Sequence, residues 1–92
     1  LLEREKWLAY TEIDEYLASF EGDEETFFIE VARKVINNGY YSIEGLKENR
    51  REILHRWAEK EILFYDPLEL KVMGNSRIYE KGMELLLERR RV

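Results

Sequence analysis

A short apolar run that ends at the chain's one proline, Pro67, constrains the fold more than any other feature. Residues 62 to 65 read Ile-Leu-Phe-Tyr, and Asp66 separates them from the proline. Proline lacks a backbone N–H donor and disfavours helix in the residue before it, so this stretch is a poor helix interior. Apolar, extended character resumes at residues 70 to 73. The sequence therefore predicts a β-hairpin over residues 62 to 73, with a turn between its strands.

The first 39 residues predict two amphipathic helices, because their apolar side chains recur at steps of three and four. We expect the first helix over residues 2 to 20, ended by Gly22, which tolerates the left-handed backbone of a helix end. Asp23 is a suitable N-cap for the second helix, which Asn-Asn-Gly at residues 37 to 39 should end.

Three further helix starts are expected around the hairpin. Ser42 should cap a brief third helix. Asn49, with Glu52 three residues on, resembles a capping box and predicts a fourth helix over residues 49 to 61. Ser76 should cap a last helix with a wide apolar face.

This order of elements predicts the fold class. From residue 23 onward it runs long helix, extended pair, short helix, tight connection, second helix and hairpin, which is the order of a winged helix-turn-helix. We therefore predict a mostly α protein with a small β-hairpin, a winged helix-turn-helix with extra N- and C-terminal helices. It forms one domain over residues 1–92, divided into an N-terminal flanking helix (1–22), a winged-helix core (23–73) and a C-terminal helix (76–92). The alternative is a helical bundle with an incidental hairpin.

The two flanking helices must bury broad apolar stripes against the core, each other or another chain. A homodimer formed through these helices is the natural expectation. The candidate interface residues are Trp7, Leu17, Tyr79, Met83 and Leu86.

Charge restricts where nucleic acid could bind. The net charge is −5, made up of −7 over residues 1 to 48 and +2 over residues 49 to 92. An acidic chain is repelled by phosphate unless its cations gather on one face. The second helix of a helix-turn-helix enters the major groove, so the candidate DNA contacts are on the predicted helix 49–61 and on the wing. They are Arg50, Arg51, His55, Arg56, Lys60 and Lys71.

Acidic residues oppose that interpretation. Glu52 and Glu59 share the helix, and Asp66 and Glu69 lie on the wing, where a DNA-reading hairpin usually carries Arg or Lys. The alternative is that the arginines form ion pairs within the helix, for example Arg56 with Glu52 or Glu59.

Motifs for catalysis and metal binding are missing. The chain has no cysteine and one histidine, and it lacks a glycine-rich phosphate loop and a Gly-x-Ser-x-Gly elbow. We therefore expect no enzyme activity, no cofactor and no metal. No apolar run approaches the ~18 residues that span a bilayer, and the N-terminus does not resemble a signal peptide, so we expect a cytoplasmic protein without membrane contact. Abundant Glu, Lys and Arg without Gln favour a hyperthermophilic source.

The stretch from Trp57 through the Ile62-to-Pro67 run to Asn75-Ser76-Arg77 resembles the C-terminal winged-helix region of archaeal P-loop ATPases related to the STAND class. The resemblance covers about the last forty residues. It departs from that family at Met73-Gly74-Asn75, where a Pro-Gln pair would be expected before the final helix. The resemblance implies that this chain is cut from a larger protein that hydrolyses ATP, and that it packs there as a regulatory or partner-binding module.

Three functions follow from these features. The leading expectation is a non-catalytic winged-helix module of an archaeal ATPase, which contacts a protein partner or the rest of its parent chain. The first alternative is a homodimeric DNA-binding transcriptional regulator with residues 49–61 as the recognition helix. The second is a pure oligomerisation domain.

Overall fold

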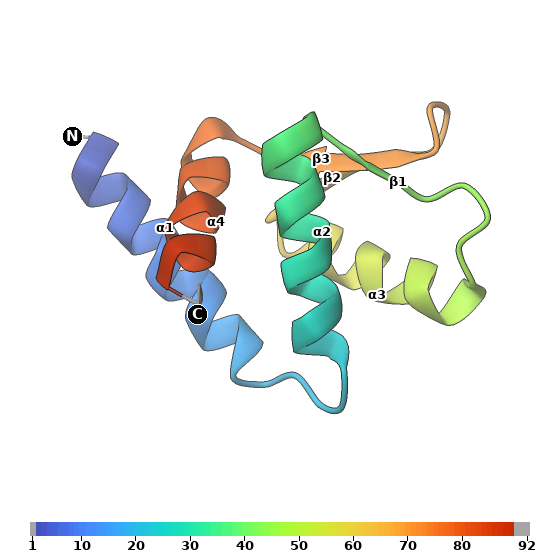
Figure 1. The fold of residues 1–92 in the computed structure, drawn as a ribbon, viewed down its shortest axis with the longest axis horizontal. Coiled ribbons are helices and arrows are strands. Elements are labelled where there is room, and N and C mark those ends of the chain that lie inside the picture. Colours follow the sequence, from blue (N-terminus) through green and yellow to red (C-terminus); the bar gives the residue numbers. More distant parts are fainter. Residues whose placement is uncertain (1, 90–92) are drawn as a thin grey trace.

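A computed structural model describes residues 2 to 89, and the statements below concern that part of the chain. Its elements form four helices and one three-stranded sheet (Figure 1). In chain order they are α1 (Leu2–Leu17), α2 (Glu24–Asn38), β1 (Tyr41–Ser42), α3 (Glu48–Glu59), β2 (Leu63–Asp66), β3 (Lys71–Gly74) and α4 (Arg77–Arg89). The predicted mostly helical chain with a small β-hairpin is confirmed.

Strands β2 and β3 form the predicted hairpin, and the Asp-Pro turn lies between them. The strands are antiparallel, with Phe64 opposite Met73 and Tyr65 opposite Val72. In the turn, Asp66 Oδ1 accepts hydrogen bonds from the backbone N–H groups of Leu68 and Glu69, at 3.0 and 3.1 Å. Such an Asp-centred turn stabilises the chain reversal through contacts within three residues of the aspartate. β1 pairs antiparallel with the other side of β3, which gives the strand order β1-β3-β2.

The core is built around Trp57 of α3, which is fully buried. Its indole lies against a ring from the loop after α1 and two rings from α2: Phe20 stacks at 5.6 Å, Phe27 lies at 5.4 Å and Phe28 meets it edge-on at 4.9 Å. Val72, which is fully buried, extends this core to the inner face of the sheet. Large rings that meet at such distances supply much of the burial that a chain of this size needs.

The flanking helices α1 and α4 pack side by side, and α4 also contacts α2 and the strand β3 (Figure 1). Gly82 of α4 makes this packing close, because a Cβ there would lie 3.0 Å from the Ala9 Cβ and 3.1 Å from the Tyr10 backbone nitrogen. The two helices therefore bury their stripes mainly against each other and the core.

The predicted third helix is wrong. After Ser42 the chain forms a turn at Glu44 and Gly45 in place of a helix. The backbone N–H of Ile43 donates to Leu70 O at 2.9 Å, which ties the segment to the hairpin, and Gly45 has a left-handed φ of 76°. A left-handed residue stops helix propagation, so the first helix of the expected helix-turn-helix is reduced to a turn.

Several predicted boundaries and caps also change. α1 ends at Leu17, and Ser19 and Phe20 follow in tight turns to Tyr16 O and Leu17 O. α3 begins at Glu48, so Asn49 lies inside it and the capping box is wrong. The Ser76 cap is confirmed, because its Oγ accepts from the Tyr79 N–H at 3.3 Å. The predicted end of the last helix, residues 90 to 92, lies outside the described residues.

Candidate interaction surface

Arg50, the first DNA-contact candidate, is half-buried and pairs with a side chain of its own fold. Its Nη2 donates to Asp23 Oδ2 at 2.6 Å, and its Cζ lies 4.6 Å from the centre of the Phe27 ring. The hydrogen bond and the charge of Arg50 lower the pKa of Asp23 below its usual range. Asp23 makes no side-chain hydrogen bond as the N-cap of α2, so its predicted role as a cap is replaced by this contact.

Arg56 is engaged in the same way. Its Nη2 lies 3.2 Å from Oε1 of Glu24, whose side chain is only 20% exposed. This pair joins α3 to the first turn of α2. The sequence analysis predicted an ion pair within α3, with Glu52 or Glu59, and the structure has Glu24 in their place. Two arginines of α3 therefore pair with carboxylates at the start of α2, Asp23 directly before it and Glu24 in its first turn.

Arg51 and His55 lie together in a shallow hollow between α3 and β2. The His55 ring stacks on Tyr65 with 4.0 Å between ring centres, and Glu48 and Glu52 line the same hollow. Arg51 Nε is buried without a hydrogen-bond partner. Because two carboxylates accompany this one arginine, the hollow does not concentrate the positive charge that phosphate binding requires.

The remaining two cations lie elsewhere. Lys60 Nζ is 6.0 Å from the Tyr16 ring centre, at the end of α3, and Lys71 Nζ is 5.2 Å from the Tyr40 ring centre, on the sheet. The six DNA-contact candidates therefore do not form one basic face.

The candidate residues for a dimer interface fall into two groups, buried and partly exposed. Leu17, Met83 and Leu86 are 2%, 0% and 0% exposed within a single chain, so they are core residues and cannot form a surface interface. Trp7 is 44% exposed, with the Arg89 guanidinium 5.8 Å from its ring centre. Tyr79 donates from its hydroxyl to Glu12 Oε1 at 2.9 Å, and burial, together with this contact, raises its pKa.

The sheet and hairpin expose apolar residues that the sequence analysis did not select. Of the six large apolar side chains exposed in the described residues, four lie here, and Leu68 at the hairpin tip is 92% exposed. The other three are Tyr40, Phe64 and Leu70. The run of residues 62 to 65 could have revealed part of this, because a strand with apolar residues at successive positions must turn some of them outward.

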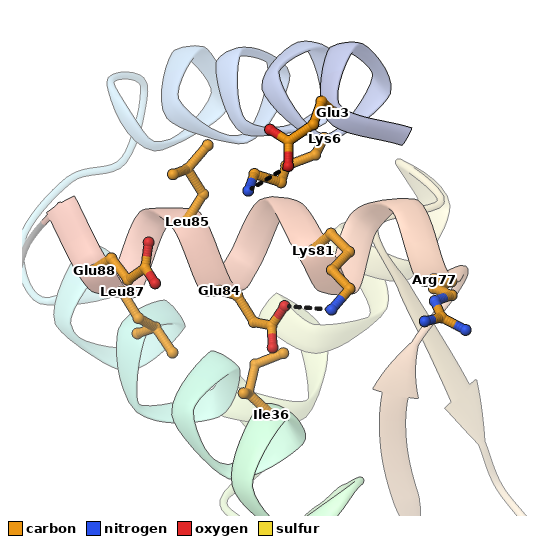
Figure 2. A pocket seen from close by; sticks show the side chains of 9 residues that line it. All are labelled: Glu3, Lys6, Ile36, Arg77, Lys81, Glu84, Leu85, Leu87 and Glu88. Carbon is orange, nitrogen blue, oxygen red and sulfur yellow. Dashed lines mark hydrogen bonds and ion pairs between the residues drawn. The ribbon is translucent and has the colours of Figure 1, made fainter. Parts of the chain in front are cut away.

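A second hollow lies between α4, α1 and α2 (Figure 2). Four of its charged residues form two ion pairs: Lys81 Nζ is 3.2 Å from Glu84 Oε2, and Lys6 Nζ is 3.5 Å from Glu3 Oε1. Its apolar lining consists of Ile36, Leu85 and Leu87. These side chains form no nucleophile and base pair of the kind that hydrolytic catalysis uses.

Among the described residues, no group of three or more His, Asp or Glu side chains is placed to hold a metal ion. No helix within the described range is long and apolar enough to cross a membrane. Comparison with protein-family models, curated proteins and solved structures finds no match to this chain.

Proposed function

We propose that this chain is a non-catalytic winged-helix module that acts through protein contact. The observation that carries the proposal is the exposure of apolar side chains on the sheet and hairpin, with Leu68 92% and Phe64 49% exposed. Contiguous exposed apolar groups on a small folded domain commonly mark a protein-contact surface.

The order of elements supports the winged-helix part of the proposal. From α2 onward, a helix, a strand, a helix and a hairpin follow one another, and the short strand β1 joins the hairpin to complete the sheet. In the proposed winged helix, α3 corresponds to the recognition helix and the hairpin to the wing, while a turn stands in place of the first helix of the helix-turn-helix motif.

The distribution of charge favours protein over DNA as the partner. Arg50 and Arg56 are committed to Asp23 and Glu24, and the wing turn contains Asp66 and Glu69. Turning either arginine toward phosphate would break its ion pair, with Asp23 for Arg50 and with Glu24 for Arg56. The DNA-binding regulator remains the alternative, and its remaining contact candidates on α3 are Arg51, His55 and Lys60.

A salt series with duplex DNA tests this choice. We expect no saturable change in the fluorescence anisotropy of a labelled random duplex at about 50 mM salt, where nonspecific electrostatic binding is strong. Tight binding would overturn the proposal if Arg51→Ala lowered the salt slope by about one unit, because that change is the signature of a lost phosphate contact. Glu44→Gln serves as the matched surface control.

The parent protein is the second part of the proposal. The resemblance of residues 57 to 77 to the C-terminal region of archaeal P-loop ATPases supports a parent that hydrolyses ATP, with this domain packed on it or on a partner. The reading frame that encodes the chain should then also encode a Gly-x-x-x-x-Gly-Lys-Ser/Thr loop. In such a parent, Leu68→Asp should change ATP turnover while Glu44→Gln does not. A parent without a phosphate loop would remove the ATPase but leave the protein-contact role standing.

A further inference from the structure

The outer face of the sheet exposes the large apolar side chains of Tyr40 (44%) and Phe64 (49%), and strand register orders the side chains on it. Tyr41 pairs with Val72, so Tyr40 precedes this pair beside Met73, which is itself opposite Phe64. Side chains alternate between the faces of a strand, and Val72 points into the core, so Tyr40, Met73 and Phe64 share the outer face. They form an apolar row that crosses β2 and β3 and ends at Tyr40, directly before β1.

A polar row lies beside the apolar one. Lys71 is opposite Ser42 on one side and Asp66 on the other. The 5.2 Å distance from Lys71 Nζ to the Tyr40 ring centre agrees with both residues lying on the outer face. The polar row therefore has one cation on β3 and one anion on β2, and its formal charge is zero.

We propose that this outer face binds a second copy of the chain, face to face, about a two-fold axis that runs parallel to the strands between β2 and β3. This rotation places β3 over β2 of the second copy and keeps the rows aligned. Met73 then lies over Phe64 of the second copy, and Lys71 lies over Asp66 of the second copy. Symmetry makes each contact twice, as an isologous interface requires. Sheets that stack in this way interdigitate their side chains about 10 Å apart.

Charge complementarity selects this occupant. A basic partner surface would place like charge over Lys71, and an acidic one would place like charge over Asp66. The two-fold arrangement pairs both residues with the opposite charge. It also joins two acidic chains through a face that adds nothing to their mutual repulsion, although each has a net charge of −5.

The small area of the outer face limits the expected affinity of the dimer. Six side chains on three short strands bury less than the roughly 800 Å² per partner of a standard interface. We therefore expect a weak dimer, with a dissociation constant on the order of 100 µM. This inference rests on the protein-contact role proposed above and names the partner.

The test is a dilution series of the chain from about 1 mM to about 10 µM, a range that brackets this dissociation constant. Sedimentation equilibrium should show a mass that rises toward that of a dimer, and amide NMR signals at residues 40, 64, 71 and 73 should shift with concentration. A monomeric mass with unchanged signals up to 1 mM overturns self-association. The protein-contact role is judged separately by the DNA salt series.

Variants locate the interface. Phe64→Glu should raise the dissociation constant by roughly tenfold or more, because it places a carboxylate over Met73 of the second copy. The matched control is Leu8→Glu, which changes a residue that is 61% exposed on α1 and should leave association unchanged. A dimer that Leu8→Glu disrupts and Phe64→Glu does not would also overturn the proposal.

A charge exchange tests the pairing itself. Lys71→Glu alone and Asp66→Lys alone should each weaken self-association, because each sets like charges over one another at both symmetric positions. Mixing the two variants should restore it, since residue 71 then faces an opposite charge at residue 66 in both directions. Thermal melts establish that each variant is folded. If Asp66→Lys unfolds the hairpin, Phe64→Glu and its control still decide the outcome.

Discussion

Arg50 joins the starts of two helices: its Nη2 donates to Asp23 Oδ2 at 2.6 Å, directly before α2, while Arg50 itself lies in the first turn of α3. The two residues are 27 positions apart in the chain. Because the same guanidinium lies over the Phe27 ring, one side chain joins an ion pair to the edge of the aromatic core.

This contact predicts an acid-dependent loss of stability. Arg50 lowers the pKa of Asp23 in the folded state, so ionised Asp23 stabilises the fold above about pH 4 and this contribution disappears as pH falls through the folded pKa. Urea unfolding at several pH values should therefore show that Asp23→Asn is less stable than the parent sequence near neutral pH. The two should converge at pH values below the folded pKa. A difference that persists unchanged in acid would contradict the assignment, and Glu44→Gln should show no such convergence.

Substitutions of Trp57 should measure how much an aromatic ring contributes to the stability of the core. Its Nε1 is buried without a hydrogen-bond partner, while its rings contact three phenylalanines. Trp57→Ala should cost about 3–5 kcal/mol in the free energy of unfolding. Trp57→Phe should cost much less, because it keeps an aromatic ring against the three phenylalanines while both variants remove the unpaired donor. Chemical denaturation measures both, and equal losses would mean that an aromatic ring at this position does not contribute to the packing.

Replacing Gly82 with a larger residue should destabilise the protein, even though alanine is the better helix former by about 1 kcal/mol. A Cβ at this position would lie 3.2 Å from the Ala9 carbonyl carbon and 3.1 Å from the Tyr10 nitrogen, which are backbone atoms that cannot rotate away. We expect Gly82→Ala to lower the free energy of unfolding by about 1–2 kcal/mol, because α1 must shift. In a double-mutant cycle, Ala9→Gly should recover part of the loss by removing the closest contact. A stabilised Gly82→Ala would show that the helices lie further apart.

Glu61 offers a stabilising change. It follows α3 with a left-handed φ of 64°, which is strained for a residue with a Cβ. Glu61→Gly should raise the free energy of unfolding by about 0.5–1 kcal/mol, because glycine is favoured just after a helix end. Lys60→Gly is the matched control, since Lys60 has a φ of −81° and its replacement should not stabilise the protein. A rise in melting temperature for both variants would point to a cause other than backbone strain.

The sequence by itself determined the elements whose signals are local. Helical periodicity predicted the two helices before residue 40, and Asp66 with Pro67 predicted the hairpin, because both signals depend on neighbours within a few residues. Ser76 was correctly expected to start α4 for the same reason. The short third helix failed because its local signal competes with a longer-range contact, the hydrogen bond from Ile43 to Leu70.

Only the tertiary structure decided what the functional candidates do. Arg50 and Arg56 find their partners 27 and 32 residues away, a distance at which no sequence spacing specifies an ion pair. Leu86 is a core residue because α4 packs on α1. The apolar stripe in the sequence of this helix was equally compatible with packing against a second chain. The apolar row of Tyr40, Met73 and Phe64 exists only because strand pairing brings three separate segments to one face, and such pairing depends on register between strands that are distant in the chain.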